Sequence, residues 1–276
     1  MLRLIAPFTG KAASDSDTGD LNGFLRDVLV EVAGENYRQT MYEAMALASA
    51  GGRGVQYDLD PPLRANERVM SGLFATAISR VALRSRTEVR IDRPERDSNV
   101  DALEHDFEGD GTPMTKNGRV DYLAWYGSRV IGIELKMASM NCDTPKVTKS
   151  IERRWVTAVD QARTVQTCLR ARQKEDGRRY PNPISIALMV IVGRRSIDML
   201  DFDDINEGIE WMEDTSVEML AGLKPRPAFV ATYTFPEEFR ALTPRRKGKE
   251  APKNGRAIYT PFVSFIAKAA VNSTGG

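Results

Sequence analysis

Residues 119–136 read RVDYLAWYGSRVIGIELK, and they largely decide the fold of this chain. Strong strand formers stand on both sides of the Gly127-Ser128 pair, and glycine readily takes the positive φ that a two-residue type I′ or II′ turn requires. The pattern therefore predicts a β-hairpin with strands at 119–126 and 129–136.

The register of this hairpin separates a charged face from an apolar one. If Tyr126 pairs with Arg129, Asp121 lies directly opposite Glu134, with the two Cβ atoms about 5 Å apart. Lys136 then projects beside Glu134, because strand side chains alternate between two faces. The next expected pairs are Val120 with Leu135 and Arg119 with Lys136. The other face is apolar and suited to a core: Val120, Tyr122, Ala124, Ile131, Ile133 and Leu135.

Two carboxylates placed opposite each other destabilise a sheet unless something compensates their charge. The compensation is a shared proton, a salt bridge to Lys136 or Arg119, or a divalent cation held between them. The cation explains the most, because Mg²⁺ favours one or two carboxylates together with waters and substrate phosphate. Lys136 then lies close enough to orient a water or to stabilise charge on a phosphate. The alternative is a surface hairpin with a solvated charge cluster.

Outward from the hairpin, apolar spacing predicts further helices and strands. Helices are expected from Leu21, over 40–50 and from about Pro62 to Arg84; a strand at 87–92; a helix at about 147–174; a buried strand at 184–192; a solvated helix within the acidic segment 198–218; and a strand at 228–235. We divide the chain into a helical N-terminal extension (1–60), a core (61–240), and a basic loop with a C-terminal segment packed on the core (241–276).

Composition excludes several classes of protein. His105 is the only histidine, so sites that need two or more imidazoles are excluded. Cys142 and Cys168 are too few for a disulfide framework or a four-cysteine zinc site. The chain shows no signal peptide, and no apolar run reaches the about 20 residues that span a bilayer, so we expect a soluble cytoplasmic protein. The formal charge of +1 leaves any preference for nucleic acid to local clustering.

The motif formed by Arg119-Val120-Asp121 and Ile133-Glu134-Leu135-Lys136 resembles that of the PD-(D/E)XK nuclease superfamily, with Val120 in place of the family's proline. The predicted order of helix, three strands, helix and strand over 62–192 also resembles that family's αβββαβ core. The resemblance implies an α/β, restriction-endonuclease-like fold, with a mixed central sheet flanked by helices. It also implies a Mg²⁺-dependent deoxyribonuclease that accepts Mn²⁺ as a substitute.

The resemblance assigns a role to each candidate residue. Asp121 and Glu134 correspond to the carboxylate metal ligands, the Leu135 carbonyl helps to coordinate the metal, and Lys136 positions the nucleophilic water. Glu67 matches an acid from the preceding helix, and Gln161 matches a glutamine on the following one. A glutamate in the first helical turn is equally explained by the helix dipole, and Glu88 is a weaker substitute for it.

Basic residues near the motif are candidates for contacts with the nucleic-acid backbone, which carry no sequence information. They are Arg119, Lys146, Lys149, Arg153 and Arg154. The basic stretch 240–256 is either a solvated loop or a phosphate-binding arm. Our first hypothesis is a DNA nuclease acting in restriction, repair or anti-phage defence, as a homodimer or as a subunit of a larger complex. The alternatives are an RNase, or a non-catalytic module that binds nucleic acid or protein on the same fold.

Overall fold

A computed structural model describes residues 1–7, 15–49, 61–64, 66–92, 117–198, 207–239, 242–244 and 256–270. Its helices are α1 (Asp15–Ser49), α3 (Glu67–Val81), α4 (Lys149–Glu175) and α5 (Ile209–Ala221), with short 3₁₀ helices at Pro62–Arg64 and Glu237–Phe239. Its strands are β1 (Leu2–Ala6), β2 (Arg84–Asp92), β3 (Asn117–Tyr126), β4 (Arg129–Asn141), β5 (Ile184–Asp198), β6 (Phe229–Thr234), β7 (Leu242–Pro244), β8 (Arg256–Tyr259) and β9 (Phe262–Ala269).

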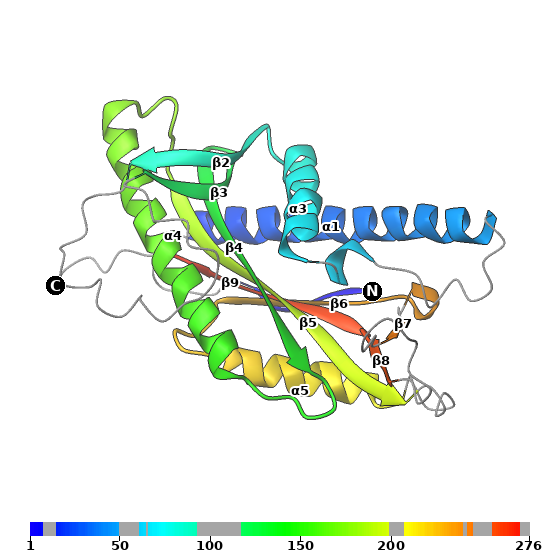
Figure 1. Ribbon diagram of the computed structural model, residues 1–276. Helices are drawn as coiled ribbons and strands as arrows, with labels where there is room; N and C mark the ends of the chain where they lie inside the picture. Colours follow the sequence, from blue (N-terminus) through cyan, green and yellow to red (C-terminus); the bar gives the residue numbers. More distant parts are fainter. Residues whose placement is uncertain are drawn as a thin grey trace.

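A mixed sheet forms the centre of the fold, in the strand order β1-β6-β9-β5-β4-β3-β2 (Figure 1). Neighbours along this path pair antiparallel except β4 and β5, which run parallel and are connected by α4. β8 pairs with the far end of β5, and β7 pairs with β8. The predicted α/β class with a mixed central sheet is therefore confirmed.

Helices cover both faces of this sheet (Figure 1). On one face, α1 and α3 share a core with apolar residues of β3, β4, β5, β6 and β9. On the other face, α4 and α5 bury Trp155 and Leu220 against Met189 and Ile266 of the sheet. Every strand that carries a candidate residue is therefore held between two helical layers.

The N-terminal helices differ from prediction. The two helices expected from Leu21 and over 40–50 are one helix, α1, because no proline interrupts it and Glu35 near its middle pairs with Arg38 and Arg80. The next helix begins at Glu67 rather than at Pro62. Asn66 caps it by accepting a hydrogen bond from the Val69 N–H.

The two ends of the chain both join the sheet, which the sequence did not predict. β1 pairs with β6, and β9 lies between β5 and β6 near the middle of the sheet. The apolar face of α1 also belongs to the core shared with the sheet. The described parts of segments 1–60 and 241–276 thus contribute to the same sheet and core as the described residues of 61–240.

The helix of the acidic segment is packed on the sheet, so the prediction of a solvated helix is wrong for one of its faces. α5 buries Met212, Val217 and Leu220. Glu213 is buried as well, and its carboxylate accepts hydrogen bonds from the hydroxyls of Thr232 and Thr234 on β6. Residues 199–206, and most of the basic stretch 240–256, lie outside the described residues.

Candidate functional site

The hairpin forms with the predicted turn, and its pairing is correct for five residue pairs. Gly127 has a φ of 54°, and the pairs run from Tyr126↔Arg129 to Tyr122↔Ile133. The pairing then stops. The expected pairs of Asp121 with Glu134, Val120 with Leu135 and Arg119 with Lys136 are not formed, which corrects that part of the prediction.

Asp121 lies where β3 separates from β4. Its Oδ2 atom accepts a hydrogen bond from the Leu135 N–H at 2.7 Å, so a side chain takes the place that a backbone carbonyl holds in a regular ladder. The Asp121 carboxylate consequently lies beside the Glu134-Leu135-Lys136 segment, although Asp121 and Glu134 are not a cross-strand pair. The structure therefore brings the four central candidate residues together.

The same break changes the face on which Val120 lies. Val120 packs with Leu123, Val130 and Leu169 on the α4 side of the sheet, instead of with Tyr122 as predicted. On the neighbouring strand, Glu88 occupies the position level with Asp121 and has a φ of 49°, which is rare for a residue with a side chain. An irregular backbone on both strands interrupts the alternation of faces at this level.

Glu134 is almost fully buried, with 2% of its surface exposed, and Lys136 is half-buried. Both lie on the α4 side of β4, because Gly132 on the same side of the strand packs against α4. A Cβ atom at Gly132 would lie 2.8 Å from Cγ1 of Val165 and 3.1 Å from Cδ1 of Leu169. The absence of a side chain at Gly132 therefore allows helix α4 to pack closely against β4.

Gln161 lies at the same position along the strand direction as Glu134, because α4 runs antiparallel to β4. Val165 lies at Gly132, and Gln161 is one helical turn, about 6 Å, before it. Glu134 is two strand residues, about 6.6 Å, beyond Gly132 in the matching direction. The Oε1 atom of Gln161 is buried and accepts no hydrogen bond from the described residues.

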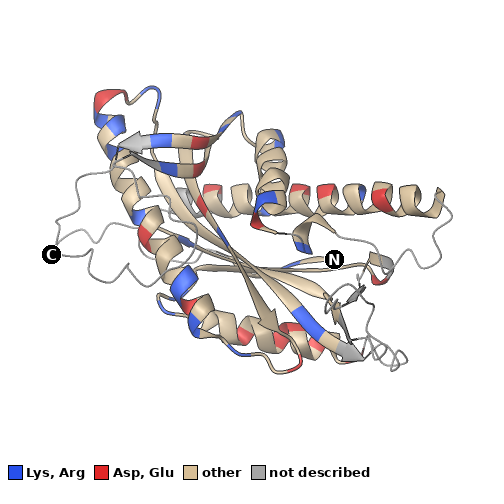
Figure 2. Ribbon diagram, viewed as in Figure 1, with Lys and Arg blue, Asp and Glu red and all other residues tan. Residues whose placement is uncertain are grey.

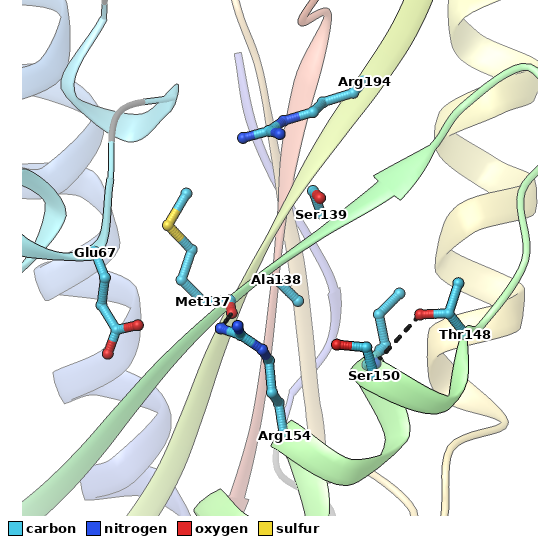
Figure 3. A pocket seen from close by; sticks show the side chains of 9 residues that line it. Glu67, Met137, Ala138, Ser139, Thr148, Ser150, Arg154 and Arg194 are labelled. Atoms are coloured by element: carbon cyan, nitrogen blue, oxygen red, sulfur yellow. Dashed lines mark hydrogen bonds between the residues drawn. The ribbon is translucent and has the colours of Figure 1, made fainter. Parts of the chain in front are cut away.

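A cleft of about 480 Å³ opens along the edge of β4 that β3 has left (Figure 3). One side is formed by Glu67 at the start of α3, and the other by the first turns of α4. The full lining is Glu67, Met137, Ala138, Ser139, Thr148, Ser150, Ile151, Arg154 and Arg194. Glu67, predicted from its place in the sequence, is thus exposed at the cleft beside the strand that carries Glu134 and Lys136.

Acidic residues near the end of β3 influence the pKa of the Tyr122 hydroxyl. Its pKa is raised from 10.0 to about 12; burial is the main cause, and the negative charges of Asp121, Glu67 and Glu88 act in the same direction. The hydroxyl donates a hydrogen bond to the Ser71 carbonyl of α3. Three acids from three elements therefore lie within electrostatic reach of one tyrosine.

The predicted nucleic-acid contacts are divided between two places. Arg154 lines the cleft and donates from Nη1 to the Met137 carbonyl at 2.7 Å. Lys149 and Arg153 are exposed in the first turns of α4, and Lys146 is exposed just before this helix, near the same end of the cleft. Arg119 is exposed on β3, where it forms an ion pair with Glu88 at 3.0 Å. Figure 2 shows basic residues along α4 and near the end of β5, and acidic residues on α5.

Arg194 is the clearest residue that the sequence analysis missed. The buried strand was predicted to end at Val192, whereas β5 continues to Asp198 and carries Arg194 to the cleft. A signal for it did exist: a strand, a helix and a second strand in succession favour a parallel pair, and the carboxyl ends of parallel strands meet at one edge. Residues after Val192 should then lie beside residues after Lys136.

The donor atoms of the site suit a hard cation. Asp121 and Glu134 supply carboxylates, and the Leu135 carbonyl points to the same edge of β4 as the N–H that Asp121 accepts, since both groups of one strand residue face one side. Mg²⁺ prefers such oxygen ligands and keeps several waters. Within the described part of the chain, no group of three or more His, Cys, Asp and Glu side chains is arranged to hold a metal, so the set depends on two carboxylates and the main chain.

Comparison with models of protein families, with curated proteins and with solved structures finds no match for this chain. None of the helices in the described ranges combines the length and the apolar character needed to cross a membrane.

Proposed function

We propose that this protein is a Mg²⁺-dependent nuclease of the PD-(D/E)XK type that hydrolyses phosphodiester bonds of DNA. The observation that carries the proposal is the hydrogen bond from the Leu135 N–H to Asp121, because it holds that carboxylate beside Glu134 and Lys136 at the start of an open strand edge. The order α3-β2-β3-β4-α4-β5 supports the same proposal, since it matches the αβββαβ core that the sequence resembles.

Each residue has a task that its position allows. Asp121, Glu134 and the Leu135 carbonyl would hold Mg²⁺, which supplies charge stabilisation at the phosphate and a lower pKa for water. Lys136 lies on the same face of β4 as Glu134, two residues further on, so its ammonium group can orient the attacking water or stabilise charge on the phosphate. Gln161, level with Glu134, offers an amide to the same water or to a phosphate oxygen.

The reaction consumes one water for each bond. The water oxygen forms a bond to phosphorus, the bond from phosphorus to one sugar oxygen breaks, and a proton passes to that leaving oxygen. The products are one phosphate monoester and one free hydroxyl. The residues named above act on the phosphate. We propose DNA as the substrate because of the family resemblance.

The test is incubation of the purified protein with supercoiled and linear DNA in Mg²⁺, Mn²⁺ or EDTA. We expect cutting that requires the metal and is abolished in Lys136→Ala, whose fold stays intact because the side chain is half-buried. Lys174→Ala, at the exposed far end of α4, is the matched control and should cut like the wild type. Full activity of Lys136→Ala would refute the assignment, and cutting of RNA alone would replace DNA with RNA as the substrate.

A further inference from the structure

The cleft holds two arginines that the nuclease chemistry does not use. Arg154 reaches it from α4 and Arg194 from β5, and Figure 3 shows both side chains extended toward the side on which Glu67 lies. The hydroxyls of Ser139 and Ser150 line the same space. Guanidinium groups and hydroxyls are donors that match phosphate oxygens.

Arg194 is available for a ligand, unlike the arginine that follows it. Arg195 forms an ion pair with Asp143 at 2.9 Å, and its Nη1 atom also donates to the Glu207 carbonyl. Successive strand side chains point to opposite faces, so Arg194 faces the cleft instead. Among the described residues, no carboxylate forms an ion pair with Arg194.

A hydrogen bond holds Arg154 in place in the cleft, and its guanidinium has further donors. Its Nη1 atom donates to the Met137 carbonyl, and this contact orients the guanidinium across the open edge of β4. A guanidinium has five N–H donors, so the remaining ones are free to reach a phosphate. The Met137 carbonyl accepts this hydrogen bond at a position where β4 is no longer paired with β3.

The end of the cleft at Arg194 is too far from the metal ligands for Arg194 to hold the phosphate that is cut. Arg194 pairs with Asn141 of β4, which lies six residues, or about 20 Å, beyond Leu135. A single phosphate group does not span that distance. A phosphate at Arg194 therefore belongs to a neighbouring nucleotide of the same strand.

We propose that Arg194 and Arg154 form a subsite that binds a non-scissile phosphate of one nucleic-acid strand along the open edge of β4. This inference rests on the proposed function for the identity of the ligand. The subsite gives the protein a specificity for a continuous nucleic-acid strand. One phosphate of that strand binds at the metal ligands and another binds in the cleft.

The experiment measures binding of a short, fluorescein-labelled single-stranded DNA by anisotropy, in EDTA and over a range of salt concentrations. Each phosphate contact on a single strand contributes about 0.7 to the slope of log K against log salt. Arg194→Ala should lower the slope by about 0.7 and the affinity at low salt about tenfold, the size expected for one charged hydrogen bond. Arg194→Lys should keep the slope.

Arg195→Ala is the matched control, because it removes the same side chain one position further along the strand and should leave the slope unchanged. An unchanged slope in Arg194→Ala, in protein whose circular dichroism equals that of the wild type, would overturn the subsite. Since EDTA prevents cutting, this result is separate from the nuclease test. A protein that never cuts DNA but shows the lowered slope has the subsite and lacks the proposed function.

Discussion

Asp121 makes two contributions that a pair of substitutions can separate. Its carboxylate accepts the hydrogen bond from the Leu135 N–H at 2.7 Å, which ties the end of β3 to β4. The same carboxylate is a proposed metal ligand. Asp121→Asn keeps an oxygen that can accept from the N–H but removes the charge, and Asp121→Ala removes both.

The structure sets the size of the stability effect. A hydrogen bond to a charged group contributes about 1.5–3 kcal/mol, and the half-buried position of Asp121 places it at the lower end, about 1.5 kcal/mol. In a chain of this size, 1 kcal/mol shifts the melting temperature by about 2–4 °C. Asp121→Ala should therefore melt about 3–6 °C below the wild type. Asp121→Asn should melt within about 2 °C of it, since it keeps an acceptor for the Leu135 N–H.

Cleavage should respond differently from stability. Loss of residues that merely orient metal ligands costs 10–100-fold, so loss of a ligand should lower the cleavage rate at least about a hundredfold in both variants. Thermal unfolding by circular dichroism and cutting of DNA in Mg²⁺ measure the two effects. Asp160→Asn, an exposed carboxylate on α4, is the control and should change neither. Wild-type cutting by Asp121→Asn would refute the ligand role, and wild-type melting of Asp121→Ala would refute the structural one.

Two further predictions concern packing and pH. Gly132→Ala should destabilise the fold by about 1–3 kcal/mol, because its Cβ would lie 2.8 Å from Val165 and 3.0 Å from Ser185. Gly72→Ala meets nothing within 4 Å in α3 and should instead stabilise it by about 0.5–1 kcal/mol; equal melting of the two variants would contradict the packing. The pKa of Tyr122 is raised from 10.0 to about 12 in the folded protein, so its contribution to stability is complete below pH 10 and is lost as pH rises toward 12. Urea unfolding across that interval should show a smaller loss for Tyr122→Phe, and an identical loss would refute this.

Local features of the sequence were sufficient for the hairpin and for its register over the five pairs nearest the turn. The Gly127-Ser128 turn and the strand formers beside it are neighbours in the chain, so their geometry follows from short-range rules. The same is true of α4 and of the buried strand from Ile184, whose apolar spacing is strong. These elements placed Glu134, Leu135 and Lys136 on one strand with Asp121 close by.

The pairing of strands that are distant in the sequence could not be predicted from local patterns. β9 pairs with β5 and β6, and β1 pairs with β6, across separations of 28 residues or more. Which edge an apolar segment joins depends on the remaining surface of the sheet, which no local pattern contains. The same limit hid Arg194, because its place at the cleft follows from the parallel pairing of β4 with β5.

The break at Asp121 escaped prediction because the register was extended as a regular ladder. A carboxylate can replace a backbone carbonyl as the acceptor for a strand N–H, and then the strands separate without leaving that N–H unsatisfied. Glu88, with its positive φ, shows that β2 departs from regular geometry at the same level. A charged residue that faces another charge in a predicted ladder therefore indicates a place where the ladder can end.

The open edge of β4 connects the fold to the proposed chemistry. β4 pairs with β5 from Ile131 to Asn141 but with β3 only as far as Ile133, so its later residues present backbone groups on one side. Such an edge inside a protein needs partners. Asp121 supplies one at Leu135 and Arg154 supplies another at Met137, so both side chains are held at the edge before any ligand arrives. A purely structural role would require only these two contacts. Such a role does not require the buried Glu134, the half-buried Lys136 or the cleft-facing Arg194. A bound phosphate chain with its metal would explain all three.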